Sequence, residues 1–207
     1  MILTLLDYAS AFVFALTGAL TASRAQLDIV GFAFLACLTA VGGGTLRDLL
    51  LDRNPVFWIA DPGIILTACL AALLVFFLAH LVESRLRLLL WLDTFALAVA
   101  VPAGTGVALL FSQPPGIVLI MGVATGCFGG LMRDVVANEV PVVLRQGELY
   151  ATAALLGSAA TLGLVHLGLP ENSALIGCAV VTWVLRAGSL RFGWSLPVYR
   201  SRPPREK

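Results

Sequence analysis

Long apolar stretches alternate with short polar segments along the whole chain. A helix needs about 20 residues to cross the hydrocarbon core of a bilayer, and seven stretches approach or reach that length. They cover residues 2–22, 30–50, 62–82, 89–110, 116–137, 148–168 and 172–190. Proline, glycine and asparagine lie in the segments between them, as is typical of turns. The pattern predicts an all-α membrane protein with seven transmembrane helices.

Composition supports a membrane protein. Hydrophobic residues make up 59% of the 207 residues and charged residues only 12%, whereas a soluble domain carries about 25% charged residues. The chain therefore has too few charged side chains to cover a water-facing surface. The first stretch contains Asp7 and has no Lys or Arg before Arg24. A signal peptide begins with positive charge, so we expect this stretch to be a retained first span.

Positive charges predict the orientation. If the N-terminus is outside, only Arg53 lies in an outer segment, and ten basic residues lie in inner segments or in the C-terminal tail. The inner set is Arg24, Arg85, Arg87, Arg145, Arg186, Arg191, Arg200, Arg202, Arg205 and Lys207. Cytoplasmic segments carry the excess of Lys and Arg. We therefore expect the N-terminus outside and the C-terminus in the cytoplasm.

The second half of the chain repeats the first at an offset of 86 residues, so that Asp7 aligns with Asp93. Three spans separate each residue from its partner, and because three is odd, the second copy crosses the membrane in the opposite direction. The sequence predicts a 3+3 inverted repeat plus a seventh helix, a plan common among transporters. The expected parts are repeat 1 at 1–82, repeat 2 at 83–168, the seventh helix at 169–190 and a basic tail at 191–207.

Each repeat carries a glycine pair or triplet inside an apolar span. Residues 41–50 read VGGGTLRDLL and residues 127–136 read CFGGLMRDVV. Each glycine weakens a helix by about 1 kcal/mol relative to alanine, so we expect spans 2 and 5 to break near the bilayer midplane. Irregular backbone in a membrane must be buried or line a water-filled cavity. The alternative is that the glycines serve close helix packing.

An Arg-Asp pair follows the glycines in both repeats, as Arg47-Asp48 and Arg133-Asp134. Charges inside a membrane usually face a bundle interior or an aqueous path. Because adjacent helix residues point about 100° apart, we expect the two pairs to face each other across the pseudo-two-fold axis. The alternative is that the arginines reach the membrane interface along their stems.

Asp7 and Asp93 lie at the start of the first and fourth predicted spans. A carboxylate is favoured at the positive end of a helix. We therefore expect these residues to cap their helices, with a place at the mouth of a pore as the alternative.

The repeat and its two motifs are similar to those of the prokaryotic branch of the trimeric intracellular cation (TRIC) channels. The resemblance covers nearly the whole chain and rests on GGGTLRD in span 2 and on GGLMRD with the following Pro141 in span 5. It implies a homotrimer in a prokaryotic inner membrane, with one pore in each protomer, lined by kinked helices 2 and 5. The resemblance implies these pore residues: Gly42, Gly43, Gly44, Thr45, Arg47, Asp48, Gly129, Gly130, Arg133 and Asp134.

The same resemblance indicates the partners. We expect potassium or sodium ions and membrane lipid as partners. We expect no cofactor and no nucleic acid. Animal members have a lysine-containing motif linked to phosphoinositide binding, whereas the only lysine here is Lys207.

Two functions are compatible with these features. The first is a passive channel for monovalent cations, chiefly potassium, in which freed backbone carbonyls replace the hydration shell of the ion. Asp48 and Asp134 would supply negative potential, and Arg47 and Arg133 would hold them. The alternative is a secondary transporter of glycine or another small amino acid, with the two repeats rocking around the site. An enzyme is not expected, because neither a zinc motif nor a nucleophile elbow occurs.

Overall fold

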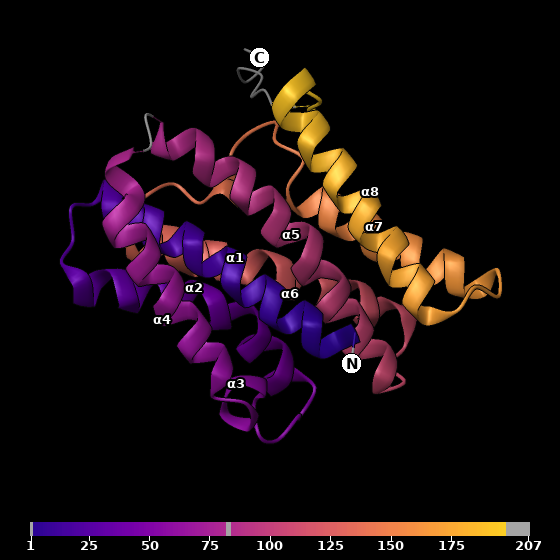
Figure 1. Cartoon of the computed structure of the whole chain (residues 1–207). Coiled ribbons are helices and arrows are strands. Elements are labelled where there is room, and N and C mark those ends of the chain that lie inside the picture. The colour runs from indigo at the N-terminus through magenta and orange to yellow at the C-terminus, as the bar shows by residue number, and fades with distance from the viewer. Residues whose placement is uncertain (1, 82–83, 198–207) are drawn as a thin grey trace, which may run out of the picture.

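The computed structural model describes residues 2–81 and 84–197. The predicted repeat boundary at 82/83 and the end of the basic tail, residues 198–207, lie outside the described residues. The helices are α1 (Ile2–Arg24), α2 (Ile29–Leu50), α3 (Phe57–Ala60), α4 (Gly63–Leu78), η1 (Ala79–Leu81), α5 (Arg85–Leu110), α6 (Pro115–Val136), η2 (Val142–Leu144), α7 (Ala151–His166) and α8 (Glu171–Phe192) (Figure 1).

The prediction of an all-α protein with seven main helices is confirmed. Within the described residues, six helices are long and apolar enough to cross a membrane. The remaining main helix, α7, corresponds to the sixth predicted span and has only 16 residues, because the chain is irregular before Ala151 and Gly168 adopts a left-handed φ of 84° after the helix. The predicted span 148–168 was therefore too long at both ends.

Short helical turns that were not predicted follow Pro55 and Pro141, which align in the two repeats. Helix α3 begins at Phe57, and the 3-10 turn η2 begins at Val142. These turns place backbone N–H groups close to the ends of α2 and α6, which matters for the site.

Four helices form the centre of the molecule. Helix α1 packs against α2 and α5, and α6 packs against α2 and α5. Helix α4 covers α1 and α2, whereas α7 and α8 cover α5 and α6 on the other side (Figure 1). The central four are thus the first and second helices of the two repeats.

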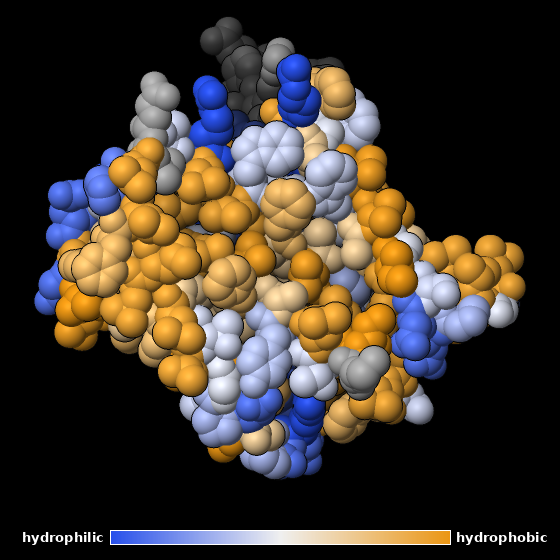
Figure 2. Space-filling model, viewed as in Figure 1, coloured by the Kyte–Doolittle hydropathy of each residue, from blue (hydrophilic) through white to orange (hydrophobic). Residues whose placement is uncertain are grey.

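Small residues allow the central helices to lie close together. Ala11, Ala15 and Ala19 on α1 and Ala96 and Ala100 on α5 are almost completely buried. The outer surface is the reverse: exposed Leu and Phe side chains are numerous, and Figure 2 shows apolar residues over much of the visible face, with polar residues gathered mainly toward its edges. This distribution is that of an integral membrane protein.

Candidate functional site

Helices α2 and α6 cross with their backbones in contact at the glycines. A Cβ atom added to Gly43 would collide with the carbonyl oxygen of Thr125, and one added to Gly129 would lie 2.5 Å from the carbonyl oxygen of Thr39. Only glycine permits so close an approach. Because Thr39 lies opposite Gly129 and Gly43 lies opposite Thr125, the two helices run antiparallel through this glycine crossing.

The expected break at the glycines is wrong. Helix α2 runs from Ile29 to Leu50 and α6 from Pro115 to Val136 without interruption. An unsatisfied backbone group in lipid costs several kcal/mol, whereas a glycine costs a helix only about 1 kcal/mol. The continuous helix is therefore the lower-energy solution, and the packing alternative describes these glycines.

Four charged residues of repeat 1 form one largely buried group, here the first cluster: Asp7, Arg47, Asp48 and Arg53. Arg47 donates from Nε to Asp48 Oδ1 at 2.7 Å and from Nη1 to Asp7 Oδ1 at 3.0 Å. Asp48 Oδ2 accepts from the backbone N–H of Phe57 at 2.8 Å. Arg53 is more distant, at 3.5 Å from Asp48 Oδ1, and its side chain is 33% exposed.

Repeat 2 forms the second cluster: Asp93, Arg133 and Asp134. Arg133 donates from Nε to Asp134 Oδ1 at 2.8 Å and from Nη1 to Asp93 Oδ1 at 2.9 Å. Asp134 Oδ2 accepts from the backbone N–H of Val142 at 2.8 Å. A further bond from Arg133 Nη1 reaches Thr17 Oγ1 of repeat 1, also at 2.8 Å.

These contacts correct three expectations. Each arginine pairs with the aspartate next to it in the sequence. Adjacent residues point about 100° apart around the helix, but the long flexible arginine side chain lets the guanidinium reach the aspartate. The two Arg-Asp pairs do not face each other, since each closes on an aspartate of its own repeat. Asp7 and Asp93 are not helix caps: Asp7 lies inside α1 and Asp93 inside α5, and both hold an arginine.

The arginines do not reach the membrane interface either. The side chains of Arg47 and Arg133 are both 0% exposed. A buried charge is tolerated only when it is paired and hydrogen-bonded, and each guanidinium here contacts two carboxylates. Snorkelling is therefore excluded for both residues.

The two clusters lie on opposite sides of the glycine crossing. Arg47 comes four residues after Gly43 on α2, and Arg133 comes four residues after Gly129 on the antiparallel α6. With the register of the crossing and a rise of 1.5 Å per residue, the two arginines are about 18 Å apart along the helix axes.

The remaining expected pore residues lie beside the crossing. Gly42 faces the Met132 side chain, and Gly44 faces the ring of Phe57. Thr45 donates to the Val41 carbonyl within α2. Gly130 faces polar atoms, which are described below.

Sequence reasoning missed a buried group beside the second cluster. Arg186 on α8 is 0% exposed, lies 2.6 Å from Glu148 Oε2 and has its guanidinium 5.0 Å from the ring centroid of Tyr150. It had been counted with the cytoplasmic tail, which is wrong. Its position within the predicted span 172–190 was the available signal, because an intramembrane arginine requires a partner.

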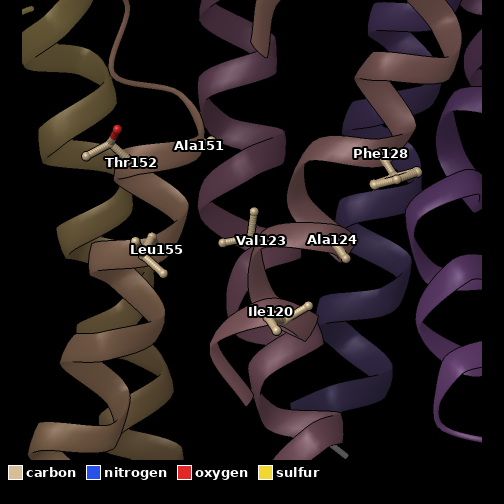
Figure 3. A pocket seen from close by; sticks show the side chains of 7 residues that line it. All are labelled: Ile120, Val123, Ala124, Phe128, Ala151, Thr152 and Leu155. Carbon is tan, nitrogen blue, oxygen red and sulfur yellow. The ribbon is translucent and has the colours of Figure 1, made fainter. Parts of the chain in front are cut away.

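An apolar groove lies between α6 and α7 on the outer face of repeat 2 (Figure 3). Its lining is almost entirely hydrocarbon: Ile120, Val123, Ala124, Phe128, Ala151, Thr152 and Leu155. An ion there would lose water without receiving oxygen ligands in return. The polar site is therefore the pair of clusters within the protein and not this groove.

Comparison with known proteins agrees with the repeat. The sequence model of the glycine transporter family matches residues 4–80 and again 90–166, and the two matches are shifted by the 86-residue offset of the repeat. A UPF0126 membrane protein of Vibrio cholerae is 39% identical over 205 residues, which are 96% of this chain and 83% of the relative. The inner membrane protein YadS of Escherichia coli is 38% identical, with 96% and 97% covered.

Solved structures give the same result. The TRIC trimeric intracellular cation channel orthologue from Rhodobacter sphaeroides is 45% identical with a TM-score of 0.89, covering 93% of this chain and 98% of that one. A further TRIC cation channel is 31% identical with a TM-score of 0.86, covering 98% and 99%. The chain therefore belongs to the prokaryotic TRIC family, whose sequence model carries the description glycine transporter.

Proposed function

We propose that the protein is a potassium-permeable channel for monovalent cations, with a route through each protomer between α1, α2, α5 and α6. One observation carries the proposal: two buried Arg-Asp-Asp groups lie on opposite sides of the glycine crossing of α2 and α6. Buried charges inside a membrane protein mark ion pathways. The relatives described as TRIC cation channels support the same activity.

In this proposal the clusters attract cations and the crossing controls their passage. The carboxylates of Asp48 and Asp134 supply negative potential, and each of the two is held by an arginine and by a backbone N–H group. At the crossing, Gly43 and Gly129 each contact a carbonyl of the opposite helix. Conduction then requires α2 and α6 to separate there, which would turn the carbonyls of Thr39 and Thr125 toward the ion.

The second candidate is a secondary transporter of glycine or another small amino acid. The description of the matching family model favours it, and guanidinium and carboxylate groups suit the two ends of a zwitterion. The two repeats would then rock about the crossing.

Ion flux and amino-acid uptake separate these candidates. Purified protein in liposomes should carry potassium down its gradient, with a rate that does not saturate at millimolar concentrations, and labelled glycine should not accumulate. Saturable glycine uptake without a potassium leak would establish the transporter instead. Empty liposomes and liposomes with heat-unfolded protein are the controls.

Orientation and assembly belong to the same proposal. Without the buried Arg186, nine inner basic residues remain against Arg53, so the N-terminus is proposed to lie outside and the C-terminus in the cytoplasm. A cysteine in place of the exposed Asn54 should then react with impermeant thiol reagents from outside; labelling from the cytoplasmic side alone would reverse the assignment.

The homotrimer should appear as three chains by native mass spectrometry in mild detergent, and an active monomer would contradict it.

A further inference from the structure

The space in front of Gly130 is open and is bordered by polar atoms. The nearest atoms that an added Cβ would meet are Tyr150 Oη at 3.4 Å, Arg133 Nη2 at 3.7 Å and Asp93 Oδ1 at 3.8 Å. These are ordinary contact distances, so a methyl-sized volume is free there. Tyr150 and Asp93 are fully or almost fully buried.

Hydrogen bonding around this space is incomplete. Among the described residues, Asp93 Oδ2, Tyr150 Oη and Arg133 Nη2 are buried without a partner. About 90% or more of buried polar groups in proteins have one, because a buried polar group without a partner loses its hydrogen bonds to water. Two of these atoms, Tyr150 Oη and Arg133 Nη2, border the free volume directly, and the third belongs to the Asp93 carboxylate whose Oδ1 borders it. Unpaired polar groups beside one free volume indicate that something polar occupies it.

The charge of the second cluster selects the occupant. Two carboxylates, Asp93 and Asp134, share the single Arg133, which leaves one negative charge in excess. Arg186 beside Tyr150 does not alter the sum, because Glu148 neutralises it. An uncompensated charge away from water is strongly unfavourable, and a single positive charge would remove it.

The equivalent place in repeat 1 is closed and neutral. Gly44 aligns with Gly130, but an added Cβ there would lie 2.5 Å from the ring of Phe57. Arg53 lies 3.5 Å from Asp48 and brings the charge of the first cluster to zero. In repeat 2 the residue aligned with Arg53 is Glu139, which pairs with Arg24. Space and excess charge therefore coincide in the second cluster.

We propose that the space in front of Gly130 binds one partly hydrated monovalent cation, with the Asp93 carboxylate and Tyr150 Oη as its protein ligands. Arg133 Nη2 donates to a water molecule of the hydration shell, which satisfies the third unpaired atom. The inference rests on the proposed channel function, in which this is a resting position of the permeating ion.

Gly130→Ala tests the site without disturbing the fold. The added Cβ fits at 3.4 Å or more and alanine favours a helix more than glycine does, yet the methyl group fills the volume that the ion needs. Gly163→Ala on α7 is the matched control, because an added Cβ there has no neighbour within 4 Å. The readout is the thermal midpoint of purified protein in potassium chloride against N-methylglucamine chloride at equal ionic strength.

Potassium should raise the midpoint of the wild type and of Gly163→Ala, and should leave that of Gly130→Ala unchanged. Tyr150→Phe removes one ligand oxygen and should raise the half-saturating potassium concentration about tenfold, the value of one net hydrogen bond. Asp93→Asn still accepts from Arg133 but removes the excess charge, so potassium dependence should vanish.

A direct observation completes the test. Crystals grown in rubidium chloride should show an anomalous peak beside Tyr150 and Asp93. Water alone at that place, or equal stabilisation of Gly130→Ala and wild type by potassium, overturns the site even if liposomes carry potassium. Conversely, a rubidium peak in a protein that carries no potassium would leave a structural cation site and reject the proposed channel.

Discussion

The two clusters share one arrangement and differ in what surrounds it. In both, an arginine donates to the aspartate that follows it in the sequence and to an aspartate of the preceding long helix of its repeat. The other oxygen of the adjacent aspartate accepts from a backbone N–H of the following helical turn. The first cluster has Arg53 as an additional member and the ring of Phe57 beside it, whereas Thr17 and Tyr150 lie beside the second.

The difference separates structural from functional demands. The shared arrangement is what a buried guanidinium needs in either repeat, because a buried charge must be paired with an opposite charge and hydrogen-bonded. The surroundings are free to differ: Ala103 stands where symmetry would repeat Thr17, and Glu139 where it would repeat Arg53. The internal repeat therefore fixes the ion pairs, and departures from it create the electrostatic asymmetry.

The largest expected effect comes from removing an arginine. Arg133→Met leaves Asp93 and Asp134 buried without a cation, and breaking a buried pair in this way costs about 3–5 kcal/mol. Arg47→Met should cost less, because Arg53 remains beside Asp48 and the Asp7 side chain is 10% exposed. The loss of stability in Arg133→Met and in Arg47→Met is measured by the yield of folded protein and by thermal unfolding in detergent. Equal losses would show that the surroundings do not matter.

Alanine at the crossing should give the next largest effect. Gly43→Ala and Gly129→Ala place a methyl group against a backbone carbonyl of the opposite helix, and overpacking of this kind costs about 1–3 kcal/mol. Potassium flux should fall in both, whereas Gly163→Ala should behave as wild type. If the crossing variants have the same thermal midpoint and the same potassium flux as Gly163→Ala, α2 and α6 do not meet at these glycines in the membrane.

Sequence alone predicted most of the spans, the 86-residue offset and two of the buried arginines, Arg47 and Arg133, but not Arg186. These signals are local: a span needs a certain length of apolar residues, and an ionised group within one is conspicuous. The straight course of α2 and α6 was not predicted, because the cost of a glycine can be read from the sequence but the gain from backbone contact between two helices cannot.

Pairing within the clusters was also beyond the sequence. The 100° between adjacent residues argued against Arg47 binding Asp48, yet the length of the arginine side chain overcame it. The partner of each arginine on the other long helix of its repeat, Asp7 or Asp93, depends on how α1 packs on α2 and α5 on α6. The aligned positions of those two aspartates already marked them as a pair, and only their role was misread.

Double-mutant cycles test whether the clusters are separate units. The pair Asp7→Asn and Arg47→Met removes two groups in contact, so a coupling energy of about 0.5–3 kcal/mol is expected. The pair Arg47→Met and Asp134→Asn spans the crossing, and groups more than about 10 Å apart are additive within about 0.5 kcal/mol. Thermal unfolding gives both values. Strong coupling across the crossing would mean that the two clusters act on one another directly.

The smallest effect, and the sharpest comparison, is expected for Arg53→Gln. The Arg53 side chain is 33% exposed and 3.5 Å from the buried Asp48. Because water can take the place of the exposed guanidinium, this partly exposed pair contributes at most about 1 kcal/mol. Stability should therefore change little. The first cluster, however, would then carry the same excess negative charge as the second.

If charge alone made a cation site, Arg53→Gln would gain a second potassium-dependent rise in thermal midpoint. We expect no such gain, because the ring of Phe57 still fills the place in front of Gly44. Combining Arg53→Gln with Phe57→Ala opens that volume and should produce the potassium dependence that neither change produces alone. A response of Arg53→Gln by itself would show that the ion is held by the field of the carboxylates without need of a shaped space, whereas no response of the double variant would show that Tyr150 is indispensable as a ligand.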